Sequence, residues 1–96
     1  MSLKTIYARS ARRDLRKLPN EDRGRIVRKI EALASGAENV DVKRLKGGDG
    51  ESRMRVGDYR VIFVMDRTND KLEIRRVRRR NEATYDLSAW LALWGL

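Results

Sequence analysis

Apolar residues recur with the period of a helix in two neighbouring stretches near the start of the chain. In residues 10–18 they are spaced three and four positions apart, and Ser10 is placed to cap a helix. Residues 20–35 repeat the pattern after Pro19, which ends the first helix, and Gly36 is the expected stop of the second. The two stretches therefore predict a helical hairpin with one apolar face.

A different pattern, typical of strands, begins at residue 52 and continues to residue 65. Polar and apolar side chains alternate from Arg53 to Val56, and an apolar run follows Arg60 after Gly57–Asp58, which predicts two antiparallel strands joined by a two-residue turn. Simple pairing about this turn places Arg55 directly opposite Arg60. Like charges that face each other across a ladder are destabilising, so this pair needs an explanation.

The remaining segments complete the expected architecture. Residues 3–8 and 71–80 are rich in strand-forming side chains, whereas residues 36–51 are predicted as a loop. Residues 81–96 have apolar positions at helical spacing, which predicts a terminal amphipathic helix. The order predicts an α+β fold with one domain over residues 1–96: an N-terminal strand, the helical hairpin packed on an antiparallel sheet, and a C-terminal helix.

Charge and composition narrow the possible functions. The chain has 23 Lys and Arg against 14 Asp and Glu, a net charge of +9, which favours a polyanionic partner. It has no histidine and no cysteine, so catalytic triads and zinc sites that use these residues are excluded. The absence of cysteine and of an apolar leader fits the cytoplasm, and no apolar run is long enough to span a membrane.

Several arginines are expected on one face of the sheet. Alternation puts Arg53, Arg55 and Arg60 on the side opposite the apolar residues, without alternating acids to pair them. The last predicted strand then brings one or more further arginines level with Arg60: Arg78, Arg79 or Arg80. Its register stays open, because a shift of one residue exchanges the two faces. Such a cluster is costly alone and becomes favourable around a phosphate.

Tyr85 follows five residues after Arg80, where the terminal helix is expected to begin. A free phenol has a pKa of about 10, and surrounding cations lower it. Tyr85 is thus a candidate base, and a surface or packing tyrosine is the alternative interpretation.

Three stretches carry a resemblance to a known family. They are SARRDLRKLPNEDRGRIVRKIEAL at residues 10–33, the segment RVGDYRVIF within residues 42–66, and RVRRRNEATY at residues 76–85. Together they resemble the RelE branch of the RelE/ParE toxin superfamily over nearly the whole chain. The resemblance implies a toxin of a type II toxin–antitoxin system. It also implies cleavage of messenger RNA in the ribosomal A site without a metal or other cofactor, through attack by the neighbouring 2′-hydroxyl.

The resemblance also implies roles for the arginines of the central hairpin. Arg53 and Arg55 match the two basic positions that hold the RNA backbone and stabilise the charge of the phosphorane. Arg60 matches the arginine that binds the scissile phosphate most directly.

The acid–base pair is implied further along the chain. Arg80, or Arg79, matches the late arginine that protonates or stabilises the leaving oxygen. Tyr85 matches the tyrosine that acts as general base on the 2′-hydroxyl.

The implied partners are a cognate antitoxin, messenger RNA on the ribosome, and ribosomal RNA, with operator DNA bound through the antitoxin. The helical hairpin and the terminal helix, with Trp90 and Trp94, are the expected antitoxin-docking surfaces. Two other functions fit the same fold. One is a ParE-type protein that poisons DNA gyrase without cleaving RNA, and the other is a non-catalytic RNA- or ribosome-binding module.

Overall fold

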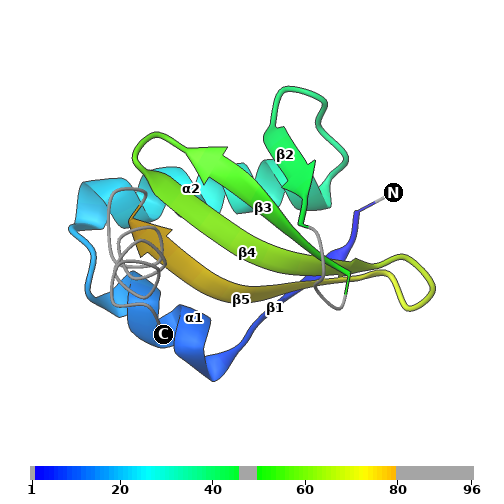
Figure 1. The fold of residues 1–96 in the computed structure, drawn as a ribbon, viewed down its shortest axis with the longest axis horizontal. Coiled ribbons are helices and arrows are strands. Elements are labelled where there is room, and N and C mark those ends of the chain that lie inside the picture. Colours follow the sequence, from blue (N-terminus) through cyan, green and yellow to red (C-terminus); the bar gives the residue numbers. More distant parts are fainter. Residues whose placement is uncertain (1, 46–49, 80–96) are drawn as a thin grey trace, which may run out of the picture.

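The computed structural model describes residues 2–45 and 50–79 (Figure 1). These residues form two helices and five strands, an α+β arrangement as the sequence predicts. In chain order the elements are β1 (Lys4–Tyr7), α1 (Arg9–Arg16), α2 (Asn20–Ala34), β2 (Asp41–Arg44), β3 (Glu51–Val56), β4 (Tyr59–Asp66) and β5 (Lys71–Arg79).

The strands form one sheet in the order β1-β5-β4-β3-β2. Each neighbouring pair from β2 to β5 is antiparallel, whereas β1 runs parallel to β5. The sheet is therefore mixed rather than purely antiparallel. Strand β2 lies inside the stretch predicted as a loop, so that prediction was wrong for residues 41–44. All four residues of β2 are exposed at the sheet edge, which is why no apolar alternation marks the strand.

The hairpin of β3 and β4 has the predicted register. Arg55 lies opposite Arg60, and Val56 lies opposite Tyr59. Gly57 has a φ of 57°, and Asp58 is not among the residues with positive φ. This combination is that of a type II′ turn, whose twist matches the twist of the two strands it joins.

Helix α1 begins earlier than the expected cap at Ser10. Ser10 lies inside α1 rather than before it, and its hydroxyl donates to the Arg75 carbonyl at 2.8 Å instead of capping the helix. Helix α2 starts directly after Pro19. Gly36, with a φ of 85°, follows the end of α2 as predicted.

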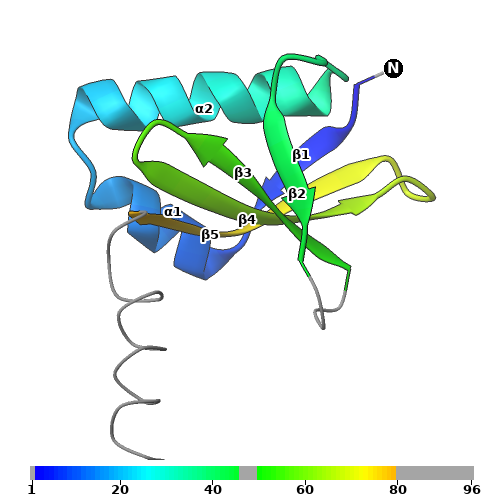
Figure 2. The same ribbon diagram turned by 45° about the horizontal axis from the view of Figure 1, so that its top comes forward.

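Both helices lie along the same side of the sheet, with α2 crossing its face and α1 beside β5 (Figure 2). Of the apolar residues predicted for this face of the hairpin, Met65 is partly buried, and the others are buried: Met54, Val56, Tyr59, Val61 and Phe63. Burying each such side chain contributes roughly 1.5–3 kcal/mol, so this layer is the main source of stability. The core joins residues from helices and strands: Ala11, Leu15, Ile26, Ile30, Leu33, Ala34, Met54, Val56, Tyr59, Val61, Phe63, Leu72, Ile74 and Val77.

Across residues 2–45 and 50–79, no helix has the length and apolarity needed to cross a membrane. The predicted terminal helix, together with Arg80 and Tyr85, lies outside the described residues.

Candidate functional site

The face of the sheet that the helices leave uncovered carries a line of three arginines. Arg60 in β4 lies opposite Arg55 of β3 on one side and opposite Arg78 of β5 on the other. Side chains directly opposite each other on adjacent strands have Cβ atoms about 4.5–5.5 Å apart, so the three guanidinium groups begin as close neighbours. We call Arg55, Arg60 and Arg78 the arginine row.

A β-bulge in β5 brings Arg78 into this row. The register shifts between Ile62 and Phe63, where Arg75 is the extra residue on the β5 side. Without the bulge, the pairing that begins at Asp66 and Lys71 would place Val77 opposite Arg60. The bulge therefore exchanges an apolar neighbour of Arg60 for a cationic one.

Arg75, the residue displaced by the bulge, is held by two carboxylates. Its Nε lies 2.9 Å from Glu73, and a terminal nitrogen lies 3.2 Å from Glu51. These ion pairs raise the pKa of Arg75, Glu73 being the larger contributor. The positive charge of Arg75 is thus compensated by these two carboxylates.

Arg60 is the central member of the row and is half-buried. Its Nε is buried and has no hydrogen-bond partner. Leaving a buried donor unsatisfied costs about 1–3 kcal/mol. A partly desolvated charge also attracts an approaching anion more strongly than an exposed one does, because less water screens it. Arg60 is therefore suited to bind an anion that reaches this face.

Two neighbouring arginines on the same face are already neutralised. Arg53 is buried, and a terminal nitrogen of its guanidinium lies 3.3 Å from the carboxylate of Asp41 in β2. The expectation that no acid pairs the hairpin arginines is wrong for Arg53, because the unpredicted strand β2 brings Asp41 beside it. Arg76 is paired with Asp14 of α1 in the same way.

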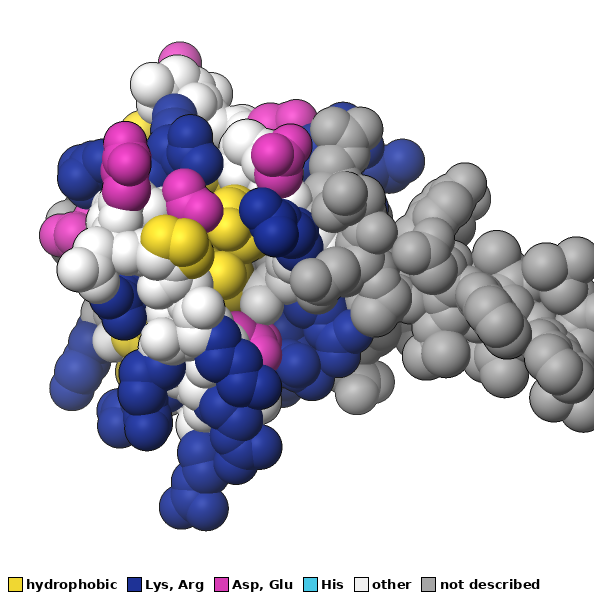
Figure 3. All heavy atoms as spheres, turned by 90° about the vertical axis from the view of Figure 1, so that its left-hand side faces the viewer, with side chains coloured by type: hydrophobic (Ala, Val, Ile, Leu, Met, Phe, Trp, Pro, Cys, Tyr) yellow, Lys and Arg dark blue, Asp and Glu magenta, His cyan; other side chains and the backbone are white. Residues whose placement is uncertain are grey.

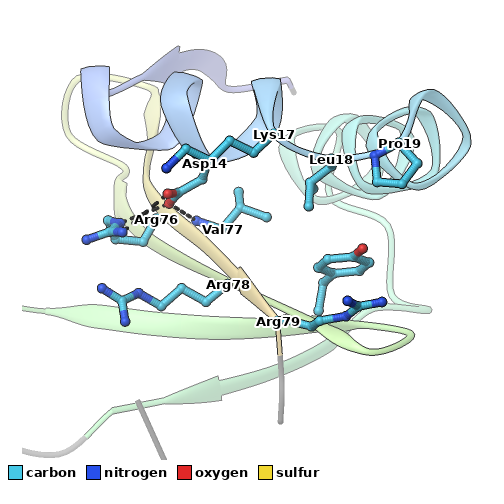
Figure 4. A pocket seen from close by; sticks show the side chains of 9 residues that line it. Asp14, Lys17, Leu18, Pro19, Arg76, Val77, Arg78 and Arg79 are labelled. Carbon is cyan, nitrogen blue, oxygen red and sulfur yellow. Dashed lines mark hydrogen bonds and ion pairs between the residues drawn. The ribbon is translucent and has the colours of Figure 1, made fainter. Parts of the chain in front are cut away.

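Asp14 links α1 to β5 through three hydrogen bonds, drawn as dashed lines in Figure 4. It accepts from Arg76 Nε at 2.9 Å, from a terminal nitrogen of Arg76 at 3.2 Å, and from the backbone N–H of Val77 at 2.9 Å. Burial raises the pKa of Asp14, but these hydrogen bonds and the charges of Arg76 and Arg78 outweigh it and hold the pKa below its usual value. Asp14 therefore stays ionised and fixes the end of β5.

A cavity of about 410 Å³ lies between the end of α1 and the end of β5. In Figure 4 the side chains of Arg76 and Arg78 extend to one side of β5, and that of Arg79 extends to the other. Most of the polar residues that line the cavity are cationic. The full lining is Asp14, Lys17, Leu18, Pro19, Tyr59, Arg76, Val77, Arg78 and Arg79. We call this cavity the basic hollow, and it adjoins the arginine row at Arg78.

Tyr59 lies on the helix side of the sheet and is buried. Its hydroxyl donates to Asp22 of α2 at 2.7 Å, and the guanidinium carbon of Arg79 lies 5.7 Å from the centre of its ring. The hydrogen bond to Asp22 and burial raise the pKa of Tyr59. Burial, followed by the charge of Glu31, likewise raises the pKa of Tyr7. Both phenols therefore stay protonated at neutral pH.

The structure brings together part of the set of residues predicted for the site. Arg55 and Arg60 are adjacent as expected, and Arg53 shares their face in an ion pair. Arg79 lies on the opposite face, beside Tyr59. Arg80 and Tyr85 lie outside the described residues.

Of two further residues of the site, the sequence left one undecided and did not indicate the other. Arg78 was one of three possibilities for the position level with Arg60, and the bulge that selects it leaves no sequence signal. Asp14 was not singled out, because its role depends on contacts with β5, 62 and 63 residues away. Within residues 2–45 and 50–79, no cluster of acidic residues could hold a metal ion.

Comparison with known proteins identifies the family. Residues 5–84 match the family described as the ParE toxin of type II toxin–antitoxin systems, parDE. The Methanocaldococcus jannaschii protein RelE1 is 35% identical over 74 residues, which cover 74% of this chain and 82% of that protein. The chain belongs to the RelE/ParE superfamily of type II toxins.

Other members of the RelE/ParE superfamily agree with this assignment. Toxin RelE3 of Methanocaldococcus jannaschii is 31% identical over 88 residues, covering 88% of this chain and 97% of that toxin. In the solved structures, the toxin–antitoxin complex RelBE2 of Mycobacterium tuberculosis contains a similar chain. That chain matches with a TM-score of 0.72 and 28% identity, over 83% of this chain and all of that one (100%).

Proposed function

We propose that this RelE/ParE toxin is a metal-independent endoribonuclease that cleaves messenger RNA on the ribosome and so inhibits translation. The observation that carries the proposal is the arginine row, with its half-buried central Arg60. Three guanidinium groups on adjacent strands form a site for a phosphate, which each arginine can bind through two parallel hydrogen bonds.

The proposed reaction is a transesterification within the RNA. The 2′-oxygen attacks the adjacent phosphorus, so the bond from the 2′-oxygen to phosphorus forms while the bond from phosphorus to the 5′-oxygen breaks. The 2′-hydroxyl proton passes to a general base, and the leaving 5′-oxygen receives a proton. Negative charge accumulates on the phosphorane between these events. Arg60, flanked by Arg55 and Arg78, is positioned to stabilise that charge.

Tyr85 is the proposed general base, and the pKa values of the other tyrosines support this choice. The chain has three tyrosines. Two of them, Tyr7 and Tyr59, have raised pKa values and keep their protons at neutral pH. A phenol close to several guanidinium groups would instead have a lowered pKa. Arg80 is the proposed group at the leaving oxygen, and Arg79 is the alternative.

The proposed partners are an antitoxin, messenger RNA and ribosomal RNA. A chain similar to this one occurs in the RelBE2 toxin–antitoxin complex of Mycobacterium tuberculosis, which supports a cognate antitoxin here. Net charge supports nucleic acid, because the excess of +9 steers the protein toward polyanions.

Cleavage on programmed ribosomes tests the proposal. Messenger ends are mapped after incubation with the parent protein, with Arg60→Ala and with Tyr85→Phe. We expect Arg60→Ala to lower the cleavage rate about 10²–10³-fold, because it removes a stabilising charge. We expect Tyr85→Phe to lower it about 10²–10⁴-fold, as removal of a general base does.

Two matched variants control for folding and for nonspecific charge removal. Arg67→Ala removes an exposed arginine of the turn between β4 and β5, and Tyr59→Phe removes the hydroxyl bound to Asp22. Both controls are expected to keep the parent's cleavage pattern. An equal decrease of cleavage in the controls and the test variants would contradict the assignment.

The same preparation distinguishes the alternative that the family description suggests. A ParE-type toxin would inhibit supercoiling by DNA gyrase and would create no new messenger ends. Inhibition of gyrase by the parent without RNA cleavage would replace the nuclease proposal with that function. Binding to ribosomes with neither activity would indicate a non-catalytic module.

A further inference from the structure

The outward side of α1 is a stripe of basic residues. Arg9, Arg12, Arg13 and Arg16 are spaced at i, i+3, i+4 and i+7, which places them on one side of the helix, and Lys17 extends the line by one position. All five side chains are exposed. We call these five residues the α1 stripe. Figure 3 shows Lys and Arg side chains gathered along the lower part of the molecule, where α1 lies in Figure 1.

The α1 stripe has no internal compensation within the described residues. Asp14 is the one acidic residue of α1, and its carboxylate is occupied by Arg76 and the Val77 N–H. Like charges three and four residues apart each destabilise a helix by about 0.2–0.5 kcal/mol. Arg9 and Arg12 near the start of α1 oppose the helix dipole, whereas Arg13 and Arg16 in its last turn complement it. Helix α1 keeps the stripe at a cost to its own stability.

We propose that the α1 stripe binds the phosphate backbone of RNA as a second surface, separate from the arginine row. Four of its five residues are arginine, whose planar fork matches phosphate. The identification of the bound polyanion as RNA rests on the proposed function. The existence of the stripe does not, because it follows from the positions of these residues on α1.

The apolar residues of α1 favour RNA over an acidic protein segment. Ala11 and Leu15 are buried against the core, and the exposed side of the helix carries no large apolar side chain. The centre of a protein–protein interface is enriched in aromatic residues and Met, with which Arg occurs. A wholly cationic surface instead fits a partner that offers a row of phosphates.

The basic hollow connects the α1 stripe to the arginine row. Lys17 of the stripe, Arg76 and Arg78 all line the cavity of about 410 Å³ between α1 and β5. Helix α1 itself, with 8 residues, is about 12 Å long. One RNA strand can therefore contact the stripe with some of its phosphates while another phosphate lies at the row.

Binding of a non-cleavable RNA tests this surface. The probe is a fluorescein-labelled 2′-O-methyl oligonucleotide, and its anisotropy is measured at several salt concentrations. The test variant replaces the arginines of the stripe: Arg9→Gln, Arg12→Gln, Arg13→Gln and Arg16→Gln. The control variant removes the same charge at other exposed positions outside α1: Lys4→Gln, Arg28→Gln, Lys71→Gln and Arg67→Gln.

We expect the test variant to bind roughly tenfold or more weakly. The slope of log affinity against log salt should become less steep by about 0.7 for each phosphate that the stripe no longer neutralises. The control variant should keep the slope of the parent protein. Circular dichroism of both variants verifies that the fold is intact.

Three outcomes would overturn the inference. Equal weakening in both variants would show that only net charge matters, and no weakening in the test variant would show that the stripe does not bind. Competition by polyglutamate as strong as that by unlabelled RNA would assign the stripe to an acidic protein. Because the probe cannot be cleaved, weaker binding by the test variant supports the stripe even if the parent proves to have no nuclease activity.

Discussion

Arg55 and Arg60 face each other across β3 and β4, and like charges in this position cost the free protein stability. The desolvated Nε of Arg60 adds to that cost. The adjacent cations Arg53 and Arg76 avoid a similar cost because Asp41 and Asp14 neutralise them. Repulsion on this face is therefore concentrated around Arg60, which is where a phosphate would have its greatest effect.

Asp14→Asn should lower the free energy of unfolding at about pH 7 by roughly 1–2 kcal/mol. The substitution removes the negative charge that accepts from Arg76 and Val77, and hydrogen bonds to charged groups contribute about 1.5–3 kcal/mol. The amide oxygen of the introduced Asn can still accept a hydrogen bond from Arg76 or Val77, which reduces the loss of stability. Urea unfolding of the two proteins measures the difference.

The pH dependence of this difference has a definite sign. The hydrogen bonds from Arg76 and Val77 hold the pKa of Asp14 below its usual value in the folded protein, so the carboxylate stabilises the fold above the pKa of the unfolded chain. The difference between parent and Asp14→Asn should therefore shrink as the pH falls below about 4, through the lowered pKa. Asp58→Asn, at an exposed turn carboxylate, is the control and should show little effect. A difference that grows on acidification would refute the role given to Asp14.

At the scale of the elements, local patterns predicted those parts of the fold that depend on nearby residues. The register of β3 and β4 follows from the two-residue turn at Gly57, and Gly36 follows the end of α2. The features that the sequence did not predict depend on distant pairing. Strand β2 has no buried side chain, β1 finds a parallel partner 67 residues along the chain, and the bulge at Arg75 has no local marker.

The candidate site follows the same division. Arg55 opposite Arg60 could be predicted, because one turn determines it. The sequence could not predict that Arg78 lies opposite Arg60, because this depends on the bulge in β5. It also could not predict that Arg53 pairs with Asp41, because this depends on β2.

A pair of glycine substitutions tests how the turn sets the register. Gly57→Ala should lower the free energy of unfolding by about 1 kcal/mol or more, because φ at this position is 57°, a backbone conformation that residues with a Cβ rarely adopt. Gly24→Ala, in the middle of α2, should raise it by about 0.5–1 kcal/mol, because its new Cβ meets only the flexible end of Arg28 at 3.5 Å. Chemical denaturation measures both.

Opposite signs are the expected result for the two substitutions. If both destabilised the protein equally, backbone conformation would not be what distinguishes the turn from the helix. Because Gly57 joins the strands that carry Arg55 and Arg60, Gly57→Ala should also weaken binding to the non-cleavable RNA, and Gly24→Ala should not.

For the whole molecule, a net charge of +9 on 96 residues has two consequences of opposite sign. Repulsion among the α1 stripe, the arginine row and the other cations destabilises the folded chain, and the same charge attracts a polyanion. Salt screens both effects. Ionic strength therefore provides a test in which stability and binding should move in opposite directions.

Raising sodium chloride from about 50 to about 500 mM should increase the melting temperature of the free protein, because the Debye length falls from more than about 10 Å to only a few ångströms. Over the same range, affinity for the non-cleavable RNA should fall steeply as counterions compete for the phosphates. The variant lacking the four arginines of the α1 stripe should show a smaller rise in melting temperature, since it has less repulsion to screen. A melting temperature that falls with salt would mean that ion pairs such as Asp14 with Arg76 outweigh the repulsion. In that case, the excess positive charge would not destabilise the folded protein, and we could no longer infer that the chain keeps this charge in order to bind a polyanion.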